Sequence, residues 1–178
     1  MKITVLTGSP HKAGSSNLLA HEFITGAEKA GHSVTVLDAA HMRLNHCMGC
    51  DECKKAGKCF HRDDGAAAQN EILSSDMVVF VTPVYYFGMS AQLKTLVDRF
   101  HGYTAALKER GMKAALIASL ADQDESAVLP LKVHYEKICS YLRFQSEGVI
   151  FAKGCATPAL TRASRYMREA YHLGLKLK

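Results

Sequence analysis

Five short, almost continuous apolar runs alternate with longer amphipathic stretches along the chain. Runs of this kind are typical of strands that are covered on both faces in a parallel sheet. The predicted strands are Lys2–Leu6, Ser33–Leu37, Met77–Thr82, Met112–Ser119 and Glu147–Phe151. The stretches between and after them predict helices at Ser16–Ala30, Gly65–Ser75, Ser90–Arg99, Ala127–Leu142 and Pro158–Leu173. The alternation therefore predicts an α/β fold with helices on both faces of a five-stranded parallel sheet.

The length of 178 residues fits one domain with one core, so residues 1–178 are expected to fold together. The irregular stretch at about residues 39–64 stands between the second strand and its helix as an insertion. Periodicity alone does not distinguish a flavodoxin order of strands from a dinucleotide-binding order. The two orders are distinguished by the sequence motifs in the loops that follow the strands.

The N-terminal segment, the apolar runs and the charge pattern indicate where the protein resides and what it binds. The N-terminal apolar run reaches turn residues after six positions, too early for a secretion signal, and no apolar run approaches bilayer length. We therefore expect a cytoplasmic protein without membrane contact. The net charge of +5 is scattered and does not alternate with aromatic residues. This pattern favours a small anionic ligand over nucleic acid.

The loop after the first strand, Gly8–Asn17, leads directly into a helix. Free N–H groups and the positive end of the helix dipole make such a loop a ready anion site. Its candidate phosphate ligands are Ser9, His11, Ser15, Ser16 and Asn17. The loop matches neither G-x-G-x-x-G nor a Walker A motif, so a terminal monophosphate such as that of FMN suits it better than a pyrophosphate. The alternative is a simple helix N-terminus capped by Ser16.

The third strand runs into a second candidate loop with three consecutive aromatic residues. Its candidate residues are Pro83, Val84, Tyr85, Tyr86, Phe87 and Gly88. Aromatic side chains offer a flat apolar surface to a ring system, although at least one of these is expected in the core or at a subunit interface. In flavodoxin order this loop and the phosphate loop are neighbours, so together they would bind two ends of one ligand.

These motifs resemble a known family over roughly the first hundred residues. The matching segments are Gly8-Ser9-Pro10, Gly14-Ser15-Ser16, Asp63-Asp64, Pro83-Val84-Tyr85-Tyr86, Met89–Lys94 and Asp98-Arg99. They resemble the NAD(P)H-dependent FMN reductases and also the iron-sulfur flavoproteins of the same superfamily. The resemblance implies a flavodoxin-like three-layer sandwich with strand order 2-1-3-4-5. It also implies FMN phosphate on the first loop, the flavin ring on Pro83–Gly88, a further contact at Ser119, NAD(P)H as co-substrate, and a homodimer.

Four of the six cysteines cluster in the insertion as Cys47-x2-Cys50-x2-Cys53-x5-Cys59. The spacing is typical of [4Fe–4S] ligands and too crowded for a two-knuckle zinc site. Iron-sulfur flavoproteins ligate a cluster with such a pattern, but relatives that bind only FMN have a similar segment. The sequence interpretation favours a thiol loop without a cluster and keeps the cluster as the alternative. Asp63-Asp64 is expected to cap the next helix, and Cys155 to be a plain loop thiol.

The function that this reading predicts is electron transfer from NAD(P)H through bound FMN to flavin, quinone or another small acceptor. No side chain is assigned as acid or base, because the hydride chemistry belongs to the flavin. The alternatives are an iron-sulfur flavoprotein or flavodoxin-like electron-transfer protein with a cluster on Cys47, Cys50, Cys53 and Cys59, and a binding protein for another nucleotide.

Overall fold

The computed structural model describes residues 1–178. Its strands are β1 (Lys2–Thr7), β2 (Ser33–Asp38), β3 (Met77–Tyr85), β4 (Gly88–Met89), β5 (Lys113–Ser119) and β6 (Gln145–Ala152). Its α-helices are α1 (Ser15–Lys29), α2 (Glu52–Ala56), α3 (Gly65–Leu73), α4 (Ala91–Asp98), α5 (Thr104–Arg110), α6 (Leu129–Leu142), α7 (Pro158–Ala163) and α8 (Tyr166–Leu175). Two short 3-10 helices, η1 (Arg99–Tyr103) and η2 (Glu125–Val128), precede α5 and α6.

The five long strands form a parallel sheet in the order β2-β1-β3-β5-β6. The predicted order 2-1-3-4-5 of the parallel strands is thereby confirmed, since β5 and β6 are the fourth and fifth of them. The additional strand β4 pairs antiparallel with the end of β3. In this flavodoxin-like arrangement β1 and β3 are neighbours, and the loops after them share the carboxyl edge of the sheet.

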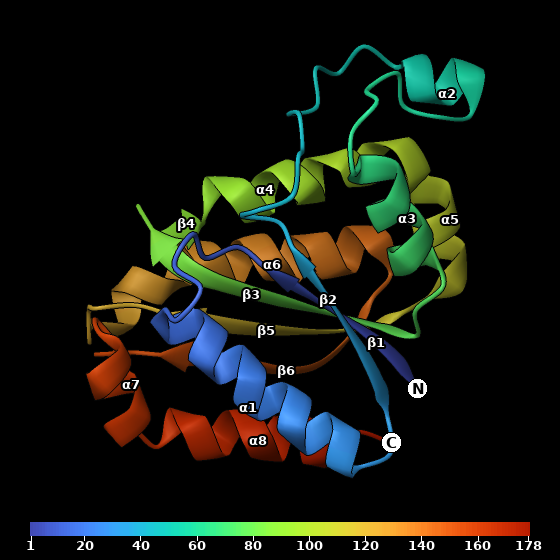
Figure 1. Cartoon of the computed structure of the whole chain (residues 1–178). Helices are drawn as coiled ribbons and strands as arrows, with labels where there is room; N and C mark the ends of the chain where they lie inside the picture. Colours follow the sequence, from blue (N-terminus) through green and yellow to red (C-terminus); the bar gives the residue numbers. More distant parts are fainter.

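Helices cover both faces of the sheet (Figure 1), and each face has its own apolar core. Leu6, Phe80 and Leu116 lie in register on neighbouring strands and pack toward α3, α4, α5 and α6. Val5 and Val79 face the other way, toward α1 and α8. Alternation on the strands thus produces the three predicted layers.

Two glycines allow α1 and α8 to cross at backbone distance. A Cβ on Gly26 would lie 2.0 Å from the carbonyl oxygen of Tyr171, and one on Gly174 would lie 2.2 Å from that of Phe23. Real side chains do not approach so closely, so these positions require hydrogen at Cα. The crossing packs α8 closely against α1 (Figure 1).

The helices differ from the prediction at three places. The predicted helix Pro158–Leu173 is interrupted at Ser164, whose backbone is extended and whose Oγ donates to Thr161 O and accepts from the N–H of Tyr166. A serine that bonds neighbouring backbone groups competes with helical hydrogen bonds, which explains the break. The structure also contains α5 and α2, which were not predicted.

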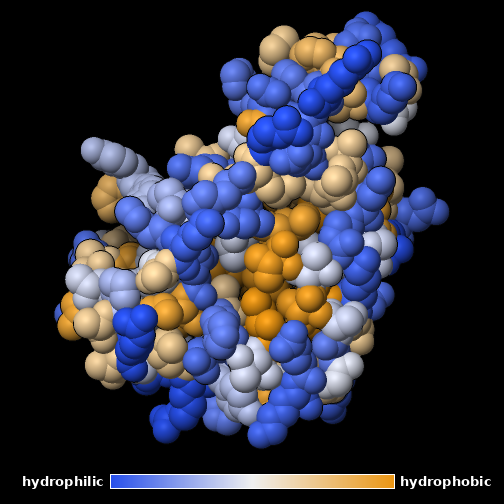
Figure 2. Space-filling view, in the orientation of Figure 1, coloured by the Kyte–Doolittle hydropathy of each residue, from blue (hydrophilic) through white to orange (hydrophobic).

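The segment between β2 and α3 carries α2 away from the body of the protein, on the side of α3 and α4 and far from β4 (Figure 1). Figure 2 shows the projecting part as mainly hydrophilic, with an apolar strip below it where β2 runs along the edge of the sheet. Val36 of β2 is 47% exposed there. No helix of the structure is both long and apolar enough to cross a bilayer.

Candidate flavin site and cysteine segment

The loop after β1 ends in a helix start without a side-chain cap. Helix α1 begins at Ser15, its N-cap is Gly14, and no acidic residue lies in its first turn. The alternative that Ser16 caps the helix is therefore wrong, because Ser16 lies inside the first turn. The loop is closed by the N–H of Gly14, which donates to the carbonyl of His11 at 2.8 Å. The N–H groups of the first turn have no partner within the helix and remain available to an anion.

Two polar side-chain atoms beside these N–H groups are buried and have no hydrogen-bond partner: Oγ of Ser16 and Oδ1 of Asn17. Ser16 is only 1% exposed. The amide nitrogen of Asn17 donates to the carbonyls of His11 and Lys12, at 3.1 Å and 3.3 Å, and so holds the loop in shape. Since buried polar atoms are normally paired, the orphaned Ser16 hydroxyl indicates a place for an oxygen-rich ligand.

The predicted loop at Pro83–Gly88 is a tight hairpin, which corrects the sequence interpretation. Strand β3 continues to Tyr85, which pairs with Gly88, and Tyr86 and Phe87 form a two-residue turn with φ of 45° and 65°. Positive φ at both turn positions matches the twist of a hairpin but strains residues that carry side chains. All three aromatic side chains are exposed, Tyr86 completely, so none of them is in the core.

The hairpin and the phosphate loop are fixed to each other by Ser90. Its hydroxyl donates to the carbonyl of Gly8 at 2.6 Å, and its N–H donates to Oγ1 of Thr82 at 2.9 Å. The N–H of Gly8 in turn donates to the carbonyl of Val81. A Cβ on Gly8 would lie 2.6 Å from Cβ of Leu93, so only glycine permits this approach of the two loops. The carboxyl edge is thereby rigid where the ligand is expected.

A cavity of about 230 Å³ opens between these loops. Its walls are Ser9, His11, Ser15, Ser16, Pro83, Val84, Tyr85, Ser119, Leu120, Ala121, Cys155, Ala156 and Pro158. Eight predicted site residues are brought together there, whereas Asn17 lines a neighbouring depression and Tyr86, Phe87 and Gly88 lie outside the cavity. The structure adds Cys155, expected to be a plain loop thiol, and its neighbours after β6. Their position after the last parallel strand is the sequence signal that places them at this edge.

The residues of this cavity fit the phosphate end of FMN. The orphaned Ser16 hydroxyl and the first-turn N–H groups of α1 suit a terminal phosphate. The volume is below the roughly 300–1,000 Å³ of sites that enclose a whole ligand, so a flavin ring would extend outward along the exposed hairpin. Binding of FMN by these residues stays a prediction.

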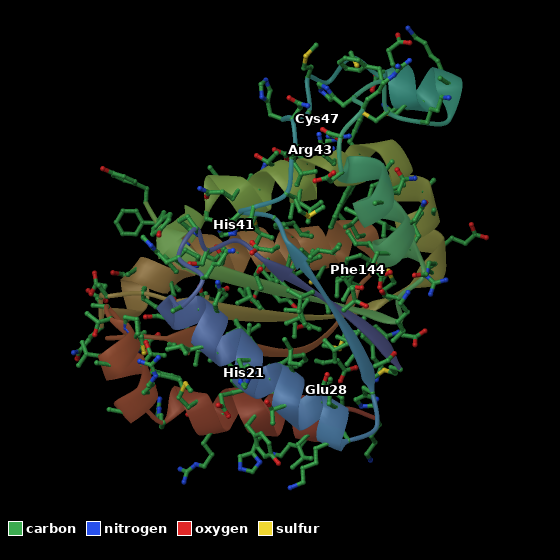
Figure 3. The ribbon with its side chains drawn as sticks, viewed as in Figure 1. His21, Glu28, His41, Arg43, Cys47 and Phe144 are labelled. Carbon is green, nitrogen blue, oxygen red and sulfur yellow. The ribbon has the colours of Figure 1, made fainter.

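The cysteine segment has a closed base made by Asp63 and Asp64. The carboxylate of Asp64 accepts from the N–H of Arg43, and the carbonyl of Arg43 accepts from the N–H of Asp64. Asp63 accepts from the N–H of Asn45 at 2.8 Å. Figure 3 shows Arg43 and Cys47 on the part of the chain that leads from β2 up to α2. The two ends of the projecting segment are thus hydrogen-bonded to each other.

The expectation that Asp63-Asp64 caps α3 is only partly correct. Asp64 is at the N-cap position without a side-chain cap bond, while Asp63 accepts from the N–H of Gly65 at 3.0 Å. The main partner of Asp63 is Arg99, and both side chains are nearly buried. Burial raises the pKa of the Asp63 carboxyl, but hydrogen bonds from Arg99, Asn45 and Gly65 outweigh it and hold the pKa well below its usual range.

A second cavity, of about 270 Å³, lies between the cysteine segment and the α3–η1 layer. Its walls are Cys47, Cys53, Gly57, Lys58, Cys59, Gly65, Ala66, Gln69, Asn70, Arg99, Gly102 and Tyr103. Three of the four clustered cysteines face this one space, while Cys50 is exposed. No group of three His, Cys, Asp or Glu side chains is in metal-binding geometry. The four thiols have the chemistry of iron-sulfur ligands, but the structure does not assemble them around one point.

Helix η1 supports the cysteine segment from below. Nε2 of His101 lies 2.6 Å from Oδ1 of Asp51, between Cys50 and Cys53 in the chain. Gly102 faces Cys53, since a Cβ there would lie 3.6 Å from its Sγ. Burial lowers the pKa of Arg99, but Asp63 and then the neighbouring thiol of Cys59 raise it overall. One turn of η1 therefore contacts the cysteine segment at Asp51, Cys53 and Cys59.

Comparisons with known proteins show which proteins the chain is similar to. Over 130 residues the chain is 31% identical to an iron-sulfur flavoprotein of Archaeoglobus fulgidus, covering 71% of this chain and 59% of that protein. It is 24% identical to YwqN of Bacillus subtilis, a candidate NAD(P)H-dependent FMN-containing oxidoreductase, covering 96% of this chain and 98% of that one. The chain spans about half the length of several iron-sulfur flavoproteins that it matches.

Among solved structures, the fold is similar to that of the NAD(P)H:quinone oxidoreductase of Methanothermobacter marburgensis, with a TM-score of 0.83 and 18% identity. The superposition covers 100% of this chain and 96% of that one, which shows the shared flavodoxin-like fold. Residues 1–144 match the family model described as NADPH-dependent FMN reductase. The match extends over most of the 178 residues, and the chain therefore belongs to the NADPH-dependent FMN reductase family.

Proposed function

We propose that this protein is an FMN-dependent oxidoreductase that passes electrons from NADH or NADPH to a small electron-poor acceptor such as a quinone or free flavin. The observation that carries the proposal is the buried, unpartnered hydroxyl of Ser16 beside the uncapped start of α1, in a cavity walled by the end of β3 and by the chain after β1, β5 and β6. Family membership and the relatives named for FMN-dependent oxidoreduction support it.

The chain's own residues bind and orient in this proposal, and bound FMN supplies the hydride chemistry. Ser16 and the first-turn N–H groups of α1 hold the phosphate, and the imidazole of His11 on the cavity wall offers a further hydrogen-bond donor. Pro83 and Val84 form an apolar wall, and the exposed aromatic turn at Tyr86 and Phe87 flanks the ring. The acceptor would approach from the solvent side of this hairpin.

The experiment is the visible spectrum of the chain reconstituted with FMN, followed by steady oxidation of NADH and of NADPH with menadione as acceptor. We expect one FMN per chain, bleaching on addition of the nicotinamide, and menadione-dependent turnover. Failure to retain FMN would overturn the flavin site. An FMN-loaded chain that dithionite reduces and neither nicotinamide reduces would overturn the assigned donor.

We further propose a second redox centre, a [4Fe–4S] cluster on Cys47, Cys50, Cys53 and Cys59. The specific observation in its favour is that three of these thiols face one cavity, under a segment whose base is closed by buried contacts. Several relatives are named iron-sulfur flavoproteins, which supports the cluster over the FMN-only interpretation. A bound cluster would supply a one-electron centre separate from the flavin cavity.

Iron and acid-labile sulfide in anaerobically purified protein test the second centre. We expect about four of each per chain, in keeping with four cysteine ligands. The variant Cys50→Ala should lose them, whereas Cys139→Ala should retain them because Cys139 is a buried core residue far along the chain. Protein that lacks iron, or Cys50→Ala protein that keeps the full complement, would refute the cluster.

A further inference from the structure

Strand β6 is an outer strand of the sheet, at the end opposite to β2. The carbonyl of Ala152 accepts from the N–H of Leu120, so the backbone groups of Ala152 face β5. This direction alternates along a strand, and the N–H and carbonyl of Val149 therefore point away from β5. No further strand pairs with them. An unpaired edge of this kind accepts another extended chain.

A groove of about 450 Å³ lies between this edge and α8. Its walls are Gly148, Val149, Ile150, Arg168, Glu169, His172, Leu173 and Lys176. The floor is apolar, because Ile150 is buried and Leu173 packs against the same core. Leu173 reaches the strand at Gly148, where a Cβ would lie 2.6 Å from its Cδ1. The groove shares no residue with the flavin cavity.

Three basic side chains of α8 line this groove, namely Arg168, His172 and Lys176. They repeat every four residues, so they project from one face of the helix. All three are exposed. The one acidic residue of the groove, Glu169, pairs with Arg165 and not with any of them. The wall that α8 presents to the groove is therefore positive and has no acidic partner within the chain.

The spacing of these basic residues matches that of an extended chain. Four residues of α-helix rise about 6 Å, and two residues of a β-strand advance about 6.6–6.8 Å. Alternate side chains of a strand point to one face. A chain added to β6 would therefore place successive same-face side chains opposite Arg168, His172 and Lys176. Carboxylates at those positions would complement the charge of α8.

We propose that the groove between β6 and α8 binds an extended acidic peptide segment, which adds to β6 as a further strand and directs alternate carboxylates toward α8. A second copy of this chain fits less well, because antiparallel pairing of β6 with itself would bring the basic residues of two α8 helices to the same face of the sheet. A nucleic-acid strand matches the charge but lacks the alternating N–H and carbonyl groups that the edge requires. The inference depends neither on the flavin nor on a metal.

The first experiment follows the fluorescence anisotropy of a labelled decapeptide in which Glu and Thr alternate, added to the full chain at about 50 mM salt. A decapeptide of the same composition with its Glu residues in one block is the matched probe. We expect the alternating peptide to bind about tenfold more tightly, because only its carboxylates share one face of a strand. Equal affinity for the two peptides would overturn the proposal. So would equally tight binding of an oligothymidylate.

The second experiment reverses the charge of the groove. Arg168→Glu combined with Lys176→Glu should weaken binding of the alternating peptide at least about tenfold, because attractive pairs become repulsive. Lys132→Glu combined with Lys137→Glu is the control, since it makes the same change of net charge at exposed positions of α6. If both double variants weaken binding equally, net charge alone attracts the peptide and the groove is not its site.

The third experiment tests the backbone contact at Val149. Val149→Pro removes the outward N–H and leaves the hydrogen bonds between β6 and β5 in place, a position at which edge strands tolerate proline. It should bind the alternating peptide at least about fivefold more weakly than Val149→Thr, which keeps the N–H. In the wild-type chain the peptide should also slow amide hydrogen exchange at Val149. Unchanged exchange, or a folded Val149→Pro chain that binds like Val149→Thr, would overturn the added strand.

Discussion

The guanidinium of Arg99 donates to both carboxylate oxygens of Asp63, at 2.9 Å and 3.2 Å. The two side chains are only 5% and 4% exposed, and they join η1 to the foot of the cysteine segment. Such a planar, two-bond contact fixes distance and angle at once. Gly65 leaves room for it, because a Cβ there would lie 2.6 Å from Nη2 of Arg99. The contact couples the cysteine segment to the core.

Asp63→Asn should lower the free energy of unfolding at pH 7 by about 3 kcal/mol, because it leaves the buried Arg99 charge without its partner. The pKa of Asp63 is lower in the folded chain than the unfolded value of about 3.9, so its contribution is complete above that pH and is lost as the pH falls further. Urea unfolding at several pH values measures this. The variant should lose less stability than wild type below about pH 4.

The control for this series is Asp98→Asn, which removes an exposed ion pair with Lys94. It should change stability by less than about 1 kcal/mol. If Asp63→Asn and wild type lose the same free energy of unfolding as the pH falls, the buried partners of Asp63 do not lower its pKa.

Ser16→Ala should weaken FMN binding about tenfold, because a neutral donor to a charged phosphate contributes roughly 1.5 kcal/mol or more. Riboflavin, which lacks the phosphate, should bind both forms equally, and quenching of flavin fluorescence measures both affinities. Thr25→Ala is the control on the same helix, since its hydroxyl bonds the carbonyl of His21. Equal loss of riboflavin and FMN affinity would place Ser16 away from the phosphate.

Phe87→Gly should raise the free energy of unfolding by about 1 kcal/mol in the absence of ligand, because glycine adopts the φ of 65° without strain. The same variant should bind FMN more weakly, since it removes an exposed ring beside the cavity. Phe87→Leu separates the two effects by keeping an apolar side chain at positive φ, and it should gain no stability. A destabilised Phe87→Gly chain would mean that the turn is not strained.

Gly174→Ala should destabilise the fold by about 3 kcal/mol, at the upper end of the range for overpacking, because its Cβ would meet the backbone oxygen of Phe23. Thermal unfolding with Glu169→Ala as an exposed control on α8 measures the effect. A variant as stable as the control would show that α1 and α8 can separate at little cost.

The parallel strands could be predicted because each is a nearly unbroken apolar run, whereas their order followed from the resemblance of the loop motifs to the FMN reductases, in whose fold β1 and β3 are neighbours. Ser9, Ser15 and Ser16 could be assigned to the carboxyl edge for the same reason. Local sequence is enough to place a residue when the residue directly follows a parallel strand, because all such residues lie at the carboxyl edge of the sheet.

The remaining features depend on contacts between residues far apart in the chain. Asp63 pairs with Arg99, which lies far from it in the sequence. No pattern of residues around either of them predicts this contact. The hairpin at Tyr86 and Phe87 contradicts ordinary turn preferences, which favour Asn and Gly at positive φ. Tyr103 resembles any core tyrosine in the sequence, and only the structure shows that its hydroxyl is unpaired.

The closed base of the cysteine segment has a consequence for how such chains diversify. Two hydrogen bonds join Arg43 to Asp64 at the two ends of the segment. The distance between these ends therefore does not depend on how many residues lie between them. The chain entropy of a flexible loop closed in this way grows only slowly, by about 0.6 kcal/mol for each doubling of its length. Changes of length in the segment should therefore cost the fold little where they spare its contacts with η1, at which His101 meets Asp51 and Gly102 faces Cys53. The cysteine segment can therefore vary in length while the cavity at the carboxyl edge of the sheet stays unchanged.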